Sequence, residues 1–196
     1  MSSPTLNFKD LAQQLPVPDG VSGDWAVETF QISKEESGWT AIRAFFHPEA
    51  FVSPGSYKKL TRRGTIVMSN TDMEIRTNLP IWSNGKGHVL VNGLGLGMVL
   101  HALLHKPEVT RVTVVENSPD VIRLVGPTFS GSRVEIIQAD ALEYRPARGI
   151  RFGAVWHDIW DSMCADNLPA MEKLHRRYGR ICDWQGSWAR ELCARR

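Results

Sequence analysis

Hydrophobic residues in the second half of the chain gather in short runs that alternate with amphipathic stretches. Five of these runs have the length and composition of buried strands. They lie at residues 88–92, 111–116, 134–138, 152–157 and, more weakly, 180–184. The segments between them are predicted to be helices. Strands alternating with helices predict an α/β domain built on a parallel, doubly wound sheet.

Two of the predicted helices carry clear end signals. Residues 118–120 are Ser-Pro-Asp, which supply a capping hydroxyl, a proline suited to the first turn and an acid that suits the helix dipole. A later helix is predicted over 167–178 and ends at Gly179. Ligands of such sheets bind beyond the carboxyl ends of the strands, so functional residues are expected there.

The residues before this region show a different pattern. A short helix is predicted from about Asn7 to Gln14, followed by a loop rich in Pro and Gly. The runs WAVETFQI (25–32), WTAIRAFF (39–46) and GTIVMS (64–69) are rich in β-branched and aromatic residues, which favour strands. They predict a small antiparallel β unit.

Chain length and these patterns predict three parts. With 196 residues the chain can form one domain with a proper core and a small appendage. We expect an N-terminal helix and loop over 1–24, the small β unit over 25–84 and a Rossmann-like domain over 85–196. The turn SNGKG at 83–87 marks the last boundary.

The composition of the chain excludes few classes of function. The chain is 42% hydrophobic and 22% charged, and its net charge of +2 gives no indication of nucleic-acid binding. No apolar run has membrane-spanning length and none at the start has signal-peptide length, so we expect a cytoplasmic protein without membrane association. The three cysteines lack CxxC spacing and are expected to be reduced thiols.

A glycine-rich turn follows the first strand of the predicted sheet. Gly93, Gly95 and Gly97 alternate with leucines in NGLGLGM, where a strand is expected to give way to a helix. Glycines let the backbone approach a ligand closely at a helix N-terminus. A dinucleotide fingerprint, G-x-G-x-x-G, would need glycine where Met98 stands. The observed G-x-G-x-G spacing resembles the first motif of class I S-adenosylmethionine-dependent methyltransferases.

Two acids at the ends of the next strands support this resemblance. Glu116 ends VTVVE, 23 residues after Gly93, where a carboxylate can accept both hydroxyls of a ribose. Asp140, in QADALEY, resembles the segment that reads adenine in this superfamily. The resemblance implies the strand order 3-2-1-4-5. Only 17 residues follow Gly179, so we expect a sheet of about five strands, truncated at its C-terminal end. It implies cofactor contacts at Gly93, Leu94, Gly95, Gly97, Glu116, Asn117, Asp140 and Ala141.

The end of the fourth strand suggests the chemistry. Asp158 and Asp161 lie three residues apart just beyond it, and two carboxylates can hold an amine and take its proton. His157 is an alternative base, but neighbouring strand residues face opposite ways, and we favour Asp158. The Asp-x-x-Asp spacing resembles that of spermidine synthase-like aminopropyltransferases, although Ser162 replaces their proline. In this branch a small β domain leads into the active site, and Glu74 is the residue of interest there.

The sequence therefore predicts an S-adenosylmethionine-dependent transferase, with Asp158 and Asp161 as its catalytic residues. A methyltransferase that acts on a small-molecule acceptor, such as an amine, is favoured. The alternatives are an aminopropyltransferase that uses decarboxylated S-adenosylmethionine and a non-catalytic nucleoside-binding module. No metal site is predicted, although His101 and His105 share a helix face. A homo-oligomer in which a partner chain completes the sheet is left open.

Overall fold

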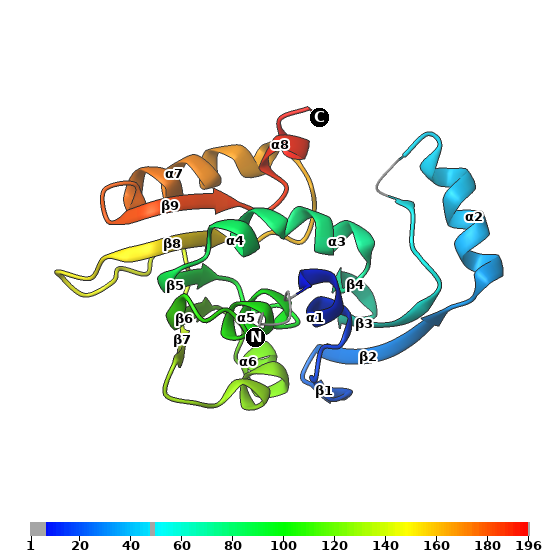
Figure 1. Ribbon diagram of the computed structural model, residues 1–196, viewed down its shortest axis with the longest axis horizontal. Helices are drawn as coiled ribbons and strands as arrows, with labels where there is room; N and C mark the ends of the chain where they lie inside the picture. Colours follow the sequence, from blue (N-terminus) through cyan, green and yellow to red (C-terminus); the bar gives the residue numbers. More distant parts are fainter. Residues whose placement is uncertain (1–6, 48–49, 196) are drawn as a thin grey trace, which may run out of the picture.

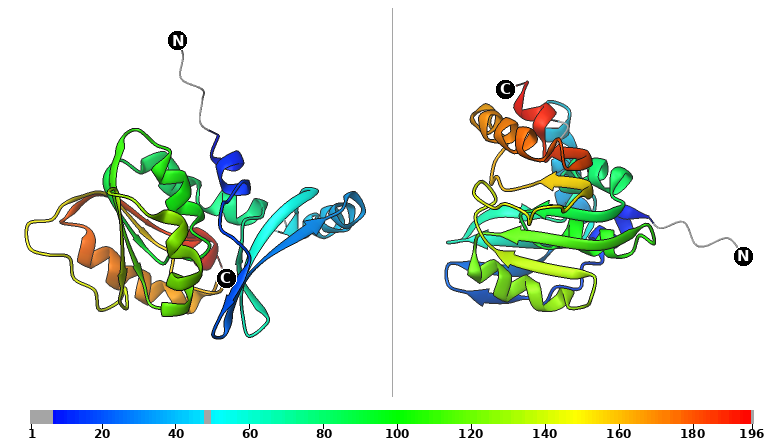
Figure 2. Two further views of the ribbon diagram at one scale, coloured as in Figure 1. Left: turned by 90° about the horizontal axis from the view of Figure 1, so that it is seen from below. Right: turned by 90° about the vertical axis from the view of Figure 1, so that its left-hand side faces the viewer.

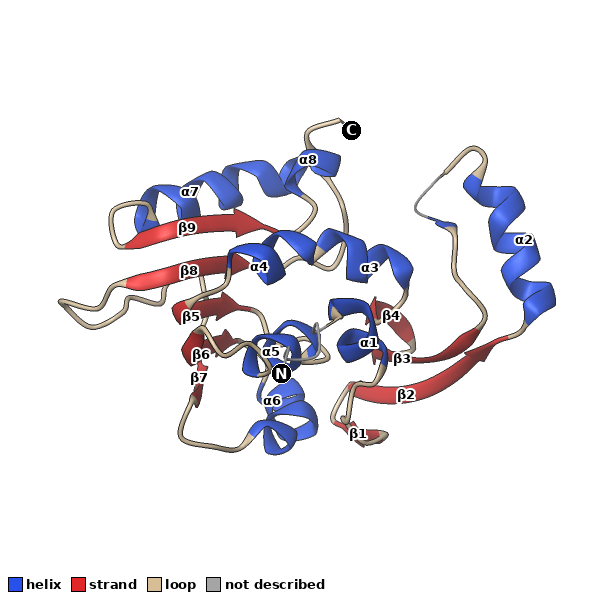
Figure 3. Ribbon diagram, viewed as in Figure 1, coloured by secondary structure: helices blue, strands red, loops and turns tan. Residues whose placement is uncertain are grey.

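The computed structural model describes residues 7–47 and 50–195, so residues 1–6 of the predicted N-terminal segment lie outside it. Two β-sheets organise the described chain, one with five parallel strands and one with four antiparallel strands (Figure 1). Figure 3 shows the strands of both sheets in red, with helices around them. In the described ranges, no helix combines the length and the apolar character needed to cross a bilayer.

The parallel sheet has the Rossmann-like strand order that the sequence predicts. Its order is β7-β6-β5-β8-β9, which is 3-2-1-4-5 along the chain, and every neighbouring pair is parallel. Its strands are β5 (Gly87–Asn92), β6 (Val109–Glu116), β7 (Val134–Gln138), β8 (Phe152–His157) and β9 (Cys182–Ser187). The four stronger strand predictions are confirmed. The fifth strand begins two residues later than its predicted start at 180 and extends beyond 184.

Helices cover both faces of this sheet, with α5 and α6 on one side and α7 on the other (Figure 2). They are α5 (Met98–Leu104), α6 (Pro119–Val125) and α7 (Leu168–Tyr178), and the short α8 (Arg190–Cys193) follows β9. Alternate residues of β5 serve the two sides: Val89 and Val91 join the core with α5, whereas Leu90 joins the core with α7. Both predicted helix signals are confirmed, because Ser118 Oγ accepts the Val121 N–H at 3.3 Å and Gly179 follows the last residue of α7.

The second sheet is an antiparallel meander in the order β1-β2-β3-β4. Its strands are β1 (Gly20–Ser22), β2 (Trp25–Ile32), β3 (Gly55–Arg62) and β4 (Thr65–Ser69). The predictions for 25–32 and 64–69 are confirmed. The sequence did not indicate β3, because its lysines interrupt the apolar pattern and a register shift between Leu60 and Thr61 breaks the alternation.

The strand predicted at 39–46 is wrong, because this segment belongs to helix α2 (Lys34–Ala44). A capping box starts the helix: Ser33 Oγ accepts the Glu36 N–H at 3.1 Å, and the Ser33 N–H donates to Glu36 Oε2 at 2.8 Å. This Ser-x-x-Glu signal precedes the aromatic run and outweighs its β propensity. The antiparallel unit therefore gains a helix that extends away from both sheets (Figure 1).

Three short helices precede β5 in the chain: α1 (Phe8–Gln13), α3 (Asp72–Thr77) and α4 (Leu79–Asn84). The predicted helix from Asn7 to Gln14 is confirmed as α1, and Asn7 Oδ1 caps it by accepting the Lys9 N–H at 3.0 Å. Helix α3 follows directly on β4, so it brings the antiparallel sheet against the carboxyl edge of the parallel one. Residues 70–78 therefore contribute to the same edge as the predicted strand ends.

Candidate functional site

A cavity of about 340 Å³ opens at the carboxyl ends of β5, β6 and β8. This volume lies within the usual range of small-molecule sites, about 300–1,000 Å³. The predicted site residues that line it all lie at or just after the ends of strands of the parallel sheet. They are Gly93, Gly95, Glu116, Asn117, Asp140, Ala141, Asp158 and Asp161. The structure thus brings together three predicted strand ends and the glycine turn. Their assignment to a ligand stays a prediction.

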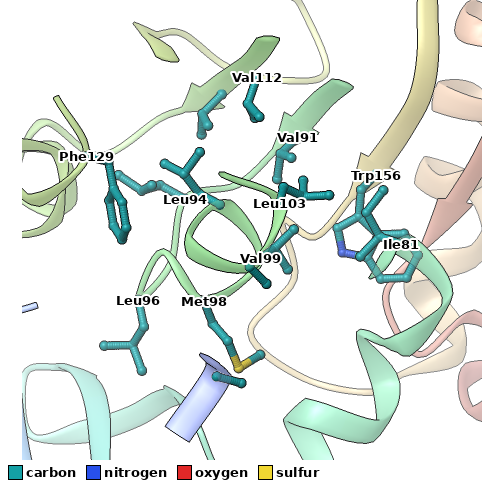
Figure 4. Close-up of a cluster of buried hydrophobic side chains, with 14 of the residues drawn as sticks. Ile81, Val91, Leu94, Leu96, Met98, Val99, Leu103, Val112, Phe129 and Trp156 are labelled. Atoms are coloured by element: carbon teal, nitrogen blue, oxygen red, sulfur yellow. The ribbon is translucent and has the colours of Figure 1, made fainter. Parts of the chain in front are cut away.

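The glycine turn presents its backbone to the cavity and its leucines to the core. Gly93 and Gly95 line the cavity, with φ angles of +100° and +50° that favour glycine. Leu94 and Leu96 are 6% and 0% exposed and pack with α5 (Figure 4). The alternation of glycine and leucine therefore fixes the turn from behind while its front stays open. Leu94 itself does not line the cavity.

Close packing also requires the glycines of this turn. A Cβ at Gly93 would overlap the carbonyl oxygen of Asp158, and a Cβ at Gly95 would overlap the sulfur of Met68. Gly97 packs against the Phe129 ring and does not line the cavity. The turn is thus held between the end of β8 and the antiparallel sheet, and only its first two glycines face the candidate site.

Glu116 is fixed by two backbone hydrogen bonds at the end of β6. Its Oε2 accepts the Leu94 N–H at 2.9 Å and its Oε1 accepts the Ser118 N–H at 2.7 Å. The half-buried carboxylate thereby joins the glycine turn to the start of α6 and still lines the cavity. Each oxygen retains acceptor capacity, which suits the recognition of paired hydroxyls.

The end of β7 supplies the outer part of this wall. Asp140 is exposed at the rim, and its Oδ1 accepts the Leu142 N–H at 2.7 Å. Ala141 is buried beside it, and the exposed Asn117 lies between Asp140 and the glycine turn in the strand order. This wall combines a small apolar surface with hydrogen-bond acceptors, as a flat heterocycle with an amino group would require.

Asp158 and His157 face opposite ways at the end of β8, as the sequence predicts. Asp158 lines the cavity, whereas His157 is fully buried on the other side, with Nδ1 2.8 Å from the side-chain amide nitrogen of Asn92. Burial raises the pKa of Asp158 to about 7, and the negative charge of Glu116 adds to the rise. Burial lowers the pKa of His157 to about 3, so it stays neutral. Asp158 is thus poised to exchange a proton near neutrality.

Glu74 adds a buried acid from outside the parallel sheet, whereas Asp158 is half-buried. It lies on α3, is 5% exposed and lines the same cavity. Its Oε2 accepts the indole N–H of Trp188 at 2.9 Å. Burial raises the pKa of Glu74 to about 8, the charge of Asp158 adds to the rise, and the Trp188 hydrogen bond opposes it. The pattern before residue 80 pointed to Glu74, but no sequence signal links it to Trp188, 114 residues away.

The cavity has a strongly acidic and aromatic lining. Five acids face it, and no described residue of its lining is Lys, Arg or His. The acids are Glu74, Glu116, Asp140, Asp158 and Asp161. Three tryptophans also line it: Trp25, Trp160 and Trp188. Acidic groups and indole faces both attract cations, so this lining suits a positively charged ligand.

Other sequence features take no part in this cavity. His101 and His105 lie on α5 and at its end, away from it, with ring centroids 4.6 Å apart. Within residues 7–47 and 50–195, no group of three or more His, Cys, Asp or Glu side chains is placed to hold a metal ion. Asp161 does reach the cavity, but it is exposed at the rim and not opposite a buried partner.

Comparisons with known proteins give a likeness of fold. No family model matches the chain, and no curated protein matches its sequence. Among solved structures, the N-methyltransferase NodS from Bradyrhizobium japonicum WM9 is 19% identical, with 62% of this chain and 67% of that chain covered at a TM-score of 0.43. The spermidine synthase from Thermotoga maritima is 18% identical, with coverages of 85% and 52% at a TM-score of 0.48.

The 23S rRNA methyltransferase ErmE is a third structure of this kind. It is 19% identical, with 57% of this chain and 45% of that chain covered at a TM-score of 0.45. The chain thus spans 45 to 67% of the length of these three proteins. Similarity at this level concerns the arrangement of strands and helices, so the function has to be argued from the cavity.

Proposed function

We propose that this chain is an S-adenosylmethionine-dependent methyltransferase that acts on a small-molecule acceptor. The observation that carries the proposal is the convergence of the glycine turn, Glu116 and Asp140 on one cavity, with Asp158 on its inner wall. These groups come from four strand ends of one sheet. Along the chain the glycine turn comes first, then Glu116 and then Asp140. A bound nucleoside would meet Glu116 with its ribose and Asp140 with its base.

The residues fit an adenosyl group in size and polarity. Glu116 is held by two backbone N–H groups with its remaining lone pairs toward the cavity, so it can accept the ribose hydroxyls. Asp140 and Ala141 offer an acceptor and a small apolar surface to adenine. Gly93 and Gly95 leave room for the chain that ends in the sulfonium. When bound, S-adenosylmethionine supplies a methyl carbon that is already electrophilic.

The protein's own contribution to catalysis is then position and proton transfer. Asp158 lies at the inner end of the cavity, where it can orient an acceptor or take its proton. Holding the acceptor nitrogen in line with the methyl carbon accounts for much of the rate in such transfers. The tryptophans that line the cavity give it apolar surface beside these acids.

Aminopropyl transfer from decarboxylated S-adenosylmethionine is a second candidate, and one observation favours it. The described lining contains no cationic side chain to pair with the carboxylate of S-adenosylmethionine. Two N–H groups of the glycine turn are already engaged, Leu94 with Glu116 and Leu96 with the Met68 sulfur at 3.2 Å. The decarboxylated compound lacks that carboxylate and ends in an ammonium, which the acidic lining would attract.

Calorimetric titration of the full chain separates these candidates. The ligands are S-adenosylmethionine, its decarboxylated form, methylthioadenosine and NAD. Tightest binding of S-adenosylmethionine, in the micromolar range of about 8 kcal/mol, supports methyl transfer. Tightest binding of the decarboxylated form supports aminopropyl transfer. Binding without turnover of any amine acceptor would make the chain a nucleoside-binding module, and binding of none of the adenosyl compounds would refute the proposal.

A further inference from the structure

We propose that Glu74 and Asp158 form a two-carboxylate clamp for the ammonium group of an alkylamine acceptor, and that Glu74 takes the proton before transfer. This inference rests on the proposed function and assigns the acceptor class. It also replaces the sequence-predicted pair of Asp158 and Asp161 by a pair whose second member comes from α3. The argument starts from how Glu74 is held.

Trp188 links the Glu74 side chain to the parallel sheet. Trp188 follows β9, its backbone N–H donates to the His157 carbonyl at 2.8 Å, and its indole N–H is shared by Glu74 Oε2 and Thr77 Oγ1 at 2.9 and 3.0 Å. The Glu74 carboxyl is therefore positioned by the parallel sheet although it comes from α3. Its donor among the described residues is the neutral indole N–H of Trp188, which leaves a buried negative charge poorly stabilised.

A cation between the two acids would relieve this cost. The titratable groups that face Glu74 are acids: Asp158 from β8 opposite it, and Glu116, Asp140 and Asp161 farther along the cavity. Without a cation, burial and mutual repulsion favour the protonated acids at neutral pH. An ammonium pairs with both carboxylates and favours their ionised forms. Amine binding is therefore expected to release protons to the solvent.

The aromatic lining further restricts the chemical class of the ligand. Trp160 from the loop after β8 and Trp188 from the end of β9 line the cavity. Trp25 of the antiparallel sheet also lines it, but its ring already faces the Arg62 guanidinium at 5.4 Å. Indole faces attract ammonium groups and also pack against alkyl chains. A hydroxyl or carboxylate acceptor would gain little from these rings, and a carboxylate would be repelled by the acids.

The transfer step balances with these groups alone. The ammonium gives one proton to the Glu74 carboxylate, and the freed nitrogen lone pair forms the new N–C bond. The C–S bond breaks and its electron pair stays on sulfur. The products are a neutral thioether and an alkylated ammonium, and Glu74 returns its proton to the solvent when they leave. Asp158 stays paired with the nitrogen throughout.

The test uses the full chain saturated with S-adenosylhomocysteine, which fills the nucleoside site without allowing transfer. Straight-chain mono- and diamines of two to six carbons are titrated by calorimetry at pH 7 in buffers with different ionisation enthalpies. We expect at least one amine to bind with proton release, and the matching alcohol not to bind. Glu74→Gln keeps an acceptor for Trp188 and should weaken amine binding at least tenfold and reduce the proton release.

A matched control is Glu143→Gln, an exposed acid outside the cavity, which should change neither quantity. Failure of every amine to bind while S-adenosylhomocysteine binds would overturn the clamp and leave the proposed function standing. Unchanged affinity and proton release in Glu74→Gln would also overturn it. Failure of S-adenosylhomocysteine itself to bind would instead refute the proposed function, and the clamp with it.

An independent observation concerns the surface of helix α2. Large apolar side chains are exposed on the helix and just beyond its C-terminal end: Trp39 by 64% and Ile42 by 62% on α2, and Phe45 by 87% and Phe46 by 79% in the turn that follows it. Trp39 and Ile42 are spaced by three residues, so they share one face of α2. The helix extends away from the rest of the chain (Figure 1). Together these exposed side chains form a large apolar patch for a monomer.

We infer that this face pairs with α2 of a second copy in an antiparallel, two-fold arrangement. Glu35 and Glu36 lie in the first turn of α2 and Arg43 in its last turn. An antiparallel pair places the acidic end of each helix beside the basic end of its partner, and two-fold symmetry repeats this contact. Pairing of two copies would bury this exposed apolar surface on both chains.

Light scattering of the full chain after gel filtration at 50 μM tests the pairing. We expect twice the mass of the chain, and the chain mass for Ile42→Glu. Val21→Glu, which alters another exposed apolar residue, should stay dimeric. Arg43→Glu should weaken the dimer, and adding Glu35→Arg should restore it. A monomeric wild-type chain would overturn the inference whether or not it binds vesicles or another protein, and so would an Ile42→Glu variant that remains dimeric.

Discussion

Glu116 connects stability and function at one residue, so its removal is the most informative perturbation. Its two oxygens accept backbone N–H groups from Leu94 and Ser118 at 2.9 and 2.7 Å. Hydrogen bonds to a charged group contribute about 1.5–3 kcal/mol each. Because the carboxylate is half-buried and water can replace part of it, we take the lower end for both. Glu116→Ala should therefore destabilise the chain by about 3 kcal/mol.

Thermal unfolding measures this loss directly. For a chain of this size 1 kcal/mol corresponds to about 2–4 °C, so Tm should fall by about 6–12 °C. Calorimetric titration of the folded variant at low temperature should show no binding of S-adenosylhomocysteine. Glu143→Ala provides the control, because its exposed ion pair with Lys173 contributes at most about 1 kcal/mol. A Tm within 2 °C of the wild type, or retained binding, would refute the role given to Glu116.

Three further predictions concern the turn and the buried acids. Gly95→Ala should destabilise the chain by about 2 kcal/mol, because its φ is +50° and a Cβ would overlap the Met68 sulfur; denaturant unfolding with no change in midpoint would contradict this. Between pH 7.5 and 8.5 the free energy of unfolding should fall as pH rises, because the folded chain keeps protons on Glu74 and Asp158, whose pKa values are raised to about 8 and about 7, that the unfolded chain has released. The lowered pKa of His157 acts only below this window, so melts of Glu74→Gln should show a shallower slope, and an equal slope would contradict the assignment. Asp158→Asn should keep nucleoside affinity within threefold and lower turnover of the bound amine about a hundredfold or more, as single-turnover assays would measure.

The strand ends were predictable because each follows a continuous apolar run. In β5, β6 and β8 burial on both faces leaves little freedom in where the polar residues begin, so Glu116 and Asp158 could be placed from sequence. The topology then brings them together, since the carboxyl ends of parallel strands share one edge. The spacing of the glycines also predicted the turn that leads from β5 into the next helix.

The remaining features depend on contacts between distant segments. Helix α2 was missed because its aromatic run has β propensity, while the capping box at Ser33 decides the local structure. The hydrogen bond between Glu74 and Trp188 joins residues 114 positions apart in the sequence. Neither residue type on its own predicts this contact. Met68 meets the glycine turn only because the antiparallel sheet packs there. Contacts of this kind can be recognised only once the relative position of the two sheets is known.

The most direct test of the central claim is a crystal structure of the full chain with S-adenosylhomocysteine. The account predicts the ribose hydroxyls on Glu116, the adenine beside Asp140 and Ala141, and the sulfur turned toward Asp158. Density for the nucleoside elsewhere on the surface, or an empty cavity at millimolar ligand, would contradict it.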